Sequence, residues 1–98
     1  MITLTKLQTR TNTTVPFYFN MPYAARQALI EAYQGTNATL RQSTIGFSSD
    51  CLVFSQIAVF TTAEACAAYQ ADPLVLADKD AKTAHCIANG ITMAESVV

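Results

Sequence analysis

The sequence predicts a single α+β domain in which helices cover one face of a four-stranded antiparallel sheet. The chain has 98 residues, which is the length of one domain. Segments rich in β-branched and aromatic residues alternate with Ala-rich segments of helical periodicity. Their order along the chain is strand, helix, strand, strand, helix, strand. We therefore expect residues 1–98 to fold as one unit.

The N-terminal part of the chain is predicted to contain one strand followed by an aromatic segment. Residues 2–8 are rich in β-branched side chains and are expected to form the first strand. Residues 9–14 are polar and Thr-rich, which is typical of a loop or an extended edge. Residues 15–19 include three adjacent aromatic residues, but Pro16 lacks a backbone N–H, so this segment is not expected to be a central strand.

A first helix is predicted over residues 22–34. Asn20 suits the N-cap, Pro22 suits the first turn, and Gly35 supplies a C-terminal stop. The expected apolar stripe, at helical spacing, consists of Ala25, Leu29, Ala32 and Tyr33. The polar residues expected away from this stripe are Arg26, Gln27, Glu31 and Gln34.

Residues 39–47 and 51–60 are predicted to be the second and third strands. The polar turn at residues 48–50 joins them as an antiparallel hairpin. The third strand is apolar on both faces. One face carries Cys51, Val53, Ile57 and Val59, and the other carries Leu52, Phe54, Ala58 and Phe60. A strand of this kind must be covered on both sides.

A capping-box pattern formed by Thr61 and Glu64 predicts a second helical region. The region is expected to split at Asp72-Pro73, because the residue before a proline avoids helical geometry. The same pair is expected to cap a further helix over residues 73–88. The apolar stripe of that helix is predicted to consist of Leu74, Ala77, Ala81, Ala84 and Ala88, with Asp78, Lys79, Asp80 and Lys82 largely outside it.

Asn89-Gly90 ends this helix and residues 91–95 are predicted to be the fourth strand, which completes the order of a ferredoxin-like βαββαβ sandwich. Right-handed crossovers place the helices on one face of the sheet, with the first and third strands central. The other face of the third strand then needs a cover, and a second copy of the chain is the simplest. Another protein, or residues 15–19 folding back, are alternatives that stay open. The candidate interface residues are Phe17, Tyr18, Phe19, Leu52, Phe54 and Phe60.

The charge pattern argues against nucleic acid and membrane partners. The net charge is −1, and six basic residues are dispersed among seven acidic ones. Non-specific nucleic-acid binding needs a clustered positive field. The N-terminus has no signal-peptide pattern, and no apolar stretch approaches the roughly 20 residues that span a bilayer. We therefore expect a protein that is not secreted by a signal peptide.

No catalytic, cofactor or metal site is predicted. His85 has no neighbouring motif to orient it as a base, and a helix-surface or half-buried position is expected. Three glycines in all exclude a phosphate-binding Gly-rich loop, and no metal-ligand spacing is present. Cys51, Cys66 and Cys86 have no CxxC spacing and are expected to be reduced thiols in the core.

Several aromatic residues and one cation are candidates for lining a pocket. We expect the tyrosine rings to belong to the core instead, and Arg41 to be a solvated charge on an edge strand. The tyrosines are Tyr18, Tyr23, Tyr33 and Tyr69.

The element order, with Phe60-Thr-Thr-Ala-Glu-Ala leading into Tyr69-Gln-Ala-Asp72-Pro73, resembles the antibiotic biosynthesis monooxygenase (dimeric α/β-barrel) superfamily. The resemblance implies that two ferredoxin-like sheets pair in a dimer. Some members of that superfamily oxidise aromatic substrates without a cofactor, and many are not enzymes. No position here matches the polar catalytic residues of those oxygenases, so the resemblance assigns no active-site residue.

The chain also resembles small proteins that recur in tailed-bacteriophage genomes. This resemblance implies a virion role, such as capsid decoration or a head–tail component, and a location in the virion or the host cytoplasm. We therefore expect a non-enzymatic assembly protein that contacts itself and other virion proteins and needs no cofactor. The alternative is a dimeric, cofactor-free oxygenase-like enzyme or a small-ligand-binding protein. The residues that carry the resemblance are Thr9-Arg10-Thr-Asn12, Pro16-Phe17-Tyr18, Ser49-Asp50-Cys-Leu52, Asp72-Pro73 and Asn89-Gly90-Ile91.

Overall fold

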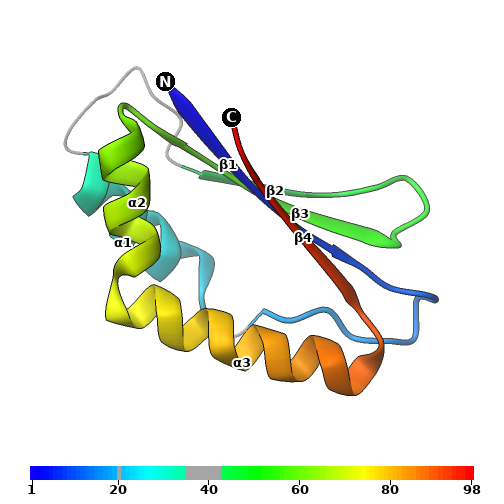
Figure 1. The fold of residues 1–98 in the computed structure, drawn as a ribbon. Coiled ribbons are helices and arrows are strands. Elements are labelled where there is room, and N and C mark those ends of the chain that lie inside the picture. The colour runs from blue at the N-terminus through cyan, green and yellow to red at the C-terminus, as the bar shows by residue number, and fades with distance from the viewer. Residues whose placement is uncertain (20, 35–42) are drawn as a thin grey trace.

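A computed structural model describes residues 1–19, 21–34 and 43–98 (Figure 1). The elements are β1 (Ile2–Thr9), α1 (Tyr23–Gln34), β2 (Ser43–Phe47), β3 (Val53–Phe60), α2 (Ala63–Ala71), α3 (Pro73–Asn89) and β4 (Thr92–Val97). The predicted α+β class is therefore confirmed. The expectations for Asn20, Gly35, Arg41 and the beginning of the second strand fall outside the described residues.

The four strands form one antiparallel sheet in the order β2-β3-β1-β4. β1 and β3 are thus the two central strands. The described helices all lie on the same side of this sheet (Figure 1). Two strand boundaries differ slightly from the expected ranges of 51–60 and 91–95. β3 begins at Val53, and β4 covers Thr92–Val97.

Alternation along the central strands decides which side chains face the helices. In β1, Leu4 and Gln8 are buried on the helix side. In β3, the buried residues are Phe54, Ala58 and Phe60, which pair with the same face of β1. Because successive side chains of a strand point to opposite faces, the intervening residues of both strands face away from the helices.

The main core lies between the sheet and the first two helices. The Phe60 and Tyr69 ring centroids are 5.2 Å apart, and Tyr33 packs edge-on against Tyr69 at 6.0 Å. Tyr33 and Tyr69 therefore pack as core rings, as the sequence predicted. The buried members of the cluster are Leu4, Ile30, Ala58, Phe60, Cys66, Tyr69 and Val75.

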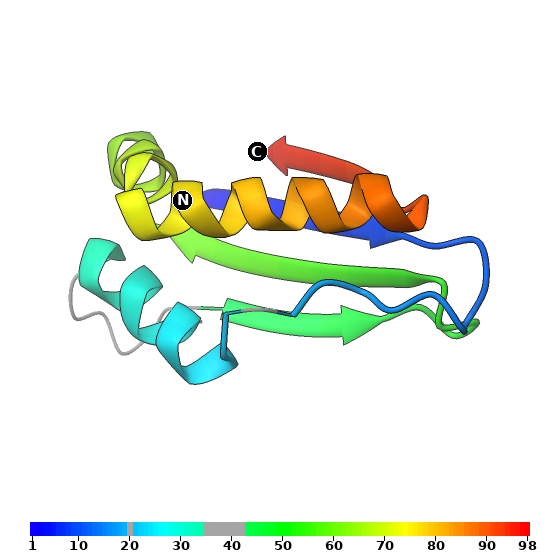
Figure 2. The same cartoon turned by 90° about the horizontal axis from the view of Figure 1, so that it is seen from below.

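The aromatic segment at residues 15–19 folds back under the sheet on the same side as the helices. Figure 2 shows the chain after β1 running back alongside α3. Phe17 is 5% exposed, and its ring centroid lies 5.8 Å from that of Phe54 and 6.2 Å from that of Phe47. The alternative that this segment covers the opposite face of the sheet is therefore wrong.

Three side chains, from β1, the loop after it and α3, hold this segment in place. Gln8 pairs with the backbone of Tyr18, since its Nε2 donates to the carbonyl at 3.2 Å and its Oε1 accepts from the amide at 2.9 Å. Arg10 donates to the Cys51 carbonyl at 2.9 Å and stacks over the Phe17 ring at 4.1 Å. His85 Nε2 lies 2.7 Å from the Pro16 carbonyl oxygen, which can only accept. His85 is half-buried, as expected.

Both ends of α3 are capped as the sequence predicted, but the capping box expected from Thr61 and Glu64 is wrong. Thr62, one residue after the expected cap, accepts from the Ala65 amide at 3.1 Å and caps α2. Asp72 accepts from the Leu74 amide at 2.8 Å and caps α3, with Pro73 as its first residue. Gly90 ends α3 in the left-handed conformation, with φ of 67°.

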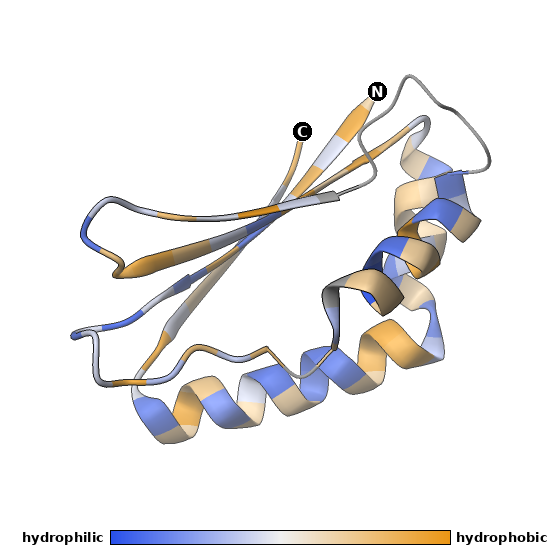
Figure 3. Cartoon of the chain, turned by 180° about the vertical axis from the view of Figure 1, so that it is seen from behind, coloured by the Kyte–Doolittle hydropathy of each residue, from blue (hydrophilic) through white to orange (hydrophobic). Residues whose placement is uncertain are grey.

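The predicted apolar stripes of the helices are wrong in part. In α1, Ala25 and Ala32 are exposed, whereas Arg26, Ile30 and Gln34 are buried. The α3 residues that were expected to be buried and are exposed are Leu74, Ala77, Ala81, Ala84 and Ala88. Figure 3 shows hydrophobic and hydrophilic residues mixed along this helix.

Two properties of the side chains explain this outcome. An alanine buries little apolar area, so a stripe of alanines decides the orientation of a helix weakly. Larger groups decide it here, because α3 buries Val75 and Cys86 against the sheet and the aromatic segment. Long side chains such as Lys82 can bury their aliphatic stems on the same side.

Candidate functional site

The face of the sheet that points away from the helices is an uncharged surface. Its residues alternate with the buried ones along the four strands, and none of these described residues is charged. They are Thr3, Thr5, Leu7 and Thr9 in β1, Thr44 and Gly46 in β2, Val53, Ser55, Ile57 and Val59 in β3, and Thr92, Ala94 and Ser96 in β4. We call this surface the open sheet face.

The register of the strands aligns these residues in rows across the open sheet face. One row runs Thr44, Ile57, Thr5, Ser96 and the next runs Gly46, Ser55, Leu7, Ala94. Leu7 is the one large side chain of its row. A hollow of about 110 Å³ lies between β1 and β4, lined in part by Thr5, Leu7 and Ala94.

The residues predicted to form an interface do not form one surface. Those buried between the sheet and the helices are Phe17, Phe54 and Phe60. Tyr18 and Leu52 are half-buried, and the Tyr18 hydroxyl donates to Asp78 Oδ1 at 2.8 Å. Phe19 is 55% exposed, and its ring packs 4.7 Å from that of Phe54. Most of the aromatic set is thus engaged within the monomer.

A second uncovered apolar surface lies on the helix side, between α1 and α3. It is a groove of about 680 Å³. Asp78 is the one charged residue among those that line it. The groove exists because both helices turn their small apolar residues outward. The lining residues are Met21, Ala25, Ala28, Leu29, Ala32, Leu74, Ala77 and Asp78.

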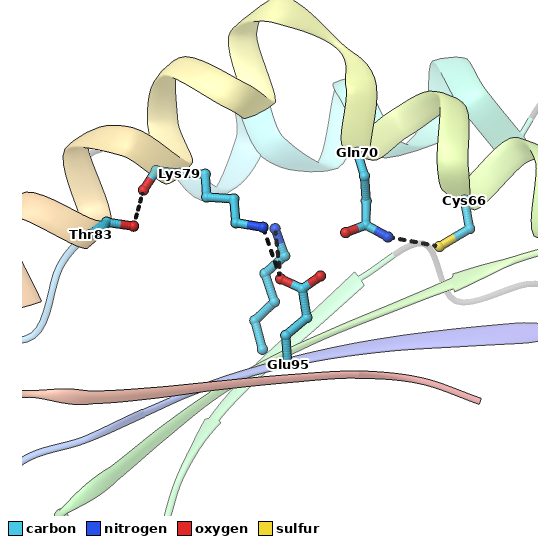
Figure 4. Close-up of polar contacts among 6 residues, drawn as sticks. Cys66, Gln70, Lys79, Thr83 and Glu95 are labelled. Atoms are coloured by element: carbon cyan, nitrogen blue, oxygen red, sulfur yellow. Dashed lines mark hydrogen bonds and ion pairs between the residues drawn. The ribbon is translucent and has the colours of Figure 1, made fainter.

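Basic residues that are far apart in the sequence come together between the sheet and α3. Lys6 Nζ lies 4.0 Å from Glu95 Oε2, and Lys79 Nζ lies 3.8 Å from the same oxygen (Figure 4). Lys82 and Arg26 line the same enclosed space as Lys6 and Lys79. The expectation that the basic residues are dispersed is therefore wrong for these four.

The thiols differ in their surroundings. Cys66 and Cys86 are buried, as predicted, and burial raises the pKa of both thiols, so they are protonated at neutral pH. Cys51 is exposed, which contradicts the prediction of a core position. It occupies the turn before β3 with φ of 62°, a left-handed conformation that fits a turn and not the interior of a strand.

No group of three or more His, Cys, Asp or Glu side chains that could hold a metal ion occurs in the part of the chain that the structure describes. Among the same residues, no helix is long and apolar enough to cross a membrane. The chain matches no known protein-family model and no curated protein. Both resemblances noted in the sequence therefore stay predictions.

The sequence indicated only part of these surfaces. Alternation in β3 identified Val53, Ile57 and Val59 as one of two apolar faces, but not as the uncovered one. The contribution of Thr5 and Leu7 was missed, although they follow the same alternation in β1. The sequence also contained an indication of the basic cluster. Lys6 lies two residues after the buried Leu4 on a central strand, so its side chain points to the same, helix-covered face.

Proposed function

We propose that this protein is a non-enzymatic assembly component that pairs with a second copy of itself through the open sheet face. The observation that carries the proposal is the absence of charge on this face among the described residues of all four strands. A sheet face that stays in water normally carries polar and charged residues. A face with Val, Ile, Leu and Thr at its centre is better covered by another surface of the same kind.

The composition of the face favours a second copy over a charged partner. It offers no charge for complementarity, whereas two identical uncharged faces can pair around a twofold axis without desolvating an ion. The large side chains of Leu7 and Ile57 and the hollow between β1 and β4 provide large and small features on the same surface. In such a pair, a large side chain of one copy can pack over the small residues of the other.

The size of the face sets the expected strength of the pairing. Four strands about 4.8 Å apart and roughly seven residues long, at about 3.3 Å per residue, span roughly 450 Å². Two such faces would bury roughly 900 Å², below the ~1,200 Å² at which stable interfaces begin. We therefore expect a dimer that dissociates on dilution.

A ferredoxin-like fold class and a virion role belong to the same proposal. The support for the fold class is the strand order β2-β3-β1-β4 with the helices on one side. The support for the virion role is the resemblance to proteins of tailed bacteriophages. Other virion proteins would then contact the assembled dimer, and the groove between α1 and α3 is one apolar surface available to them.

Light scattering over a hundredfold range of concentration tests the proposal. Ile57→Lys places a charge at the centre of the open sheet face, and we expect it to leave the chain monomeric at concentrations where the wild type is a dimer. Ile87→Lys is the matched control, because Ile87 is 75% exposed on α3, away from the sheet. A wild type that stays monomeric, or an Ile57→Lys variant that dimerises like the wild type, would overturn the proposal.

A second candidate function is the binding of a small apolar ligand, as in the oxygenase-like alternative. The groove between α1 and α3 favours it, because a volume of about 680 Å³ lies in the range of small-molecule sites. The groove has no tyrosine in its lining, in contrast to the pocket expected from the sequence. This function would use the helix side of the molecule and is compatible with a dimer formed through the sheet.

A further inference from the structure

The space between α3 and the sheet holds more positive than negative charge. Two hollows meet there and share Lys79 and Lys82 in their linings. The inner hollow is also lined by Lys6 and Arg26, and the outer one, of about 280 Å³, opens beside β4. The charged side chains around the two hollows are Lys6, Arg26, Lys79 and Lys82 against Asp78 and Glu95.

The two carboxylates are already engaged and do not neutralise the cluster. Glu95 is shared between Lys6 and Lys79 at 4.0 and 3.8 Å, the outer limit of an ion pair. Asp78 accepts a hydrogen bond from the Tyr18 hydroxyl at 2.8 Å. Four cations therefore share two carboxylates, with Lys6 and Arg26 shielded from water and Lys79 and Glu95 at the exposed entrance.

Burial makes this excess of positive charge costly. The Lys6 side chain is only 12% exposed, and Arg26 is 8% exposed. Burial, followed by the nearby positive charge of Lys82, lowers the pKa of Lys6 to about 8. Burial also lowers the pKa of Lys82. An anion brought into the cluster would remove this repulsion, because an opposite charge favours the protonated form of a lysine.

We propose that the cluster of Lys6, Lys79, Lys82 and Arg26 between α3 and the sheet binds the oxyanion group, phosphate or carboxylate, of a small molecule. The outer hollow beside β4 has room for such a group, and its two lysines are the first contacts that an entering anion would meet. Lys6 lies behind them and shares the charge of Glu95 with Lys79. Lys6 and Glu95 are on the helix side of β1 and β4, so the cluster lies on the opposite side of the sheet from the open sheet face and meets it only at the edge strand β4, where Ala94 lines the outer hollow.

Titration calorimetry with inorganic phosphate, and separately with acetate, at constant ionic strength set by sodium chloride tests this site. We expect saturable binding of at least one of the two anions, with one site per chain. Binding of phosphate without acetate would indicate that the natural ligand carries a phosphate group. Binding of acetate would indicate that the site also accepts a carboxylate. Lys82→Gln should weaken binding at least tenfold, and Lys82→Arg, which keeps the charge, should retain it.

Two further variants keep the test decisive. Asp80→Asn changes a charge on the exposed side of α3 and should leave the binding constant unchanged. Lys6→Met removes a buried charge without shortening the side chain much, and should weaken binding at least tenfold while the protein stays folded. No saturable binding of either anion, or equal binding by the wild type, Lys82→Gln and Lys6→Met, would overturn the proposal. Because Ala94 lines both the outer hollow and the open sheet face, the titrations are made at a concentration where the chain is monomeric, which keeps this test apart from that of the dimer.

Discussion

Lys6 is the residue whose ionisation should be most visible in the stability of the protein. Its pKa is lowered from 10.5 to about 8 in the folded state. Between these two pH values the unfolded chain holds a proton that the folded chain has released, so this residue makes the protein more stable as pH rises. Below pH 8 the penalty is fully present, and a shift of this size corresponds to about 3 kcal/mol at most. The charged groups that face Lys6 are Lys79, Lys82, Arg26, Glu95 and Asp78.

We therefore expect Lys6→Met to be more stable than the wild type at pH 7, by roughly 1–3 kcal/mol after the loss of the pair with Glu95. The difference should shrink as pH rises from 8 to 10.5. Urea unfolding of both proteins across this range measures it. Lys82 and the Cys66 thiol interact electrostatically with Lys6, so the difference between the two proteins reports the ionisation of Lys6 together with its coupling to these groups. A variant that is less stable than the wild type at pH 7 would show that Lys6 is stabilised by its partners.

Among the elements, the aromatic segment at residues 15–19 covers the part of β2 and β3 that the helices leave uncovered on their side of the sheet. Phe17 is 5% exposed and contacts the rings of Phe47 and Phe54, so Phe17→Ala should cost about 3–5 kcal/mol of unfolding free energy. Phe19 is 55% exposed and lies at the edge of the ring cluster, against Phe17, Phe47 and Phe54, so Phe19→Ala should cost less, about 1–2 kcal/mol.

Urea unfolding of these two variants measures whether the segment at residues 15–19 belongs to the folded core or only lies on the surface. Equal, small losses for both would mean that the segment is peripheral to the folded core. Because Phe17→Ala is expected to destabilise the monomer, its effect on assembly cannot report on an interface. Phe19→Ala is the variant of this segment that can be used for that purpose.

The strands and helix ends could be predicted from the sequence because their signals are local. Alternation in β3, and the caps at Asp72 and Gly90, depend on neighbouring residues alone. The buried faces of α1 and α3 could not be predicted in the same way. Alanine fits both a buried and an exposed position, and the polar Arg26 is buried beside Tyr69, which is distant in the sequence.

The candidate surfaces show the same limit. The open sheet face follows from alternation once the side covered by the helices is known. The basic cluster depends on contacts between residues that are separated by most of the chain, such as Lys6 and Glu95. In the sequence each of these residues looks like an ordinary surface charge. The antiparallel pairing of β1 with β4 places Lys6 next to Glu95, on the side of the sheet that faces α3.

At the scale of the whole molecule, the open sheet face and the groove between α1 and α3 are uncovered apolar surfaces of the described residues that lie on opposite sides of the sheet. A twofold pairing through the sheet closes on itself at the dimer, which leaves both grooves of the dimer facing outward. The dimer and the groove should therefore respond to different substitutions. Ala28, on the exposed side of α1, lines the groove and has no part in the sheet.

We expect Ala28→Glu to leave the dimer mass unchanged in light scattering and to abolish binding of the uncharged apolar fluorescent probe Nile red to the groove. The physical reason is that a carboxylate in an apolar groove must be desolvated before the probe can bind. Ile57→Lys should show the reverse, with probe binding retained and the dimer lost. If Ala28→Glu instead converts dimers into monomers, the helices and not the sheet form the interface between copies, and the roles assigned to the two surfaces are exchanged.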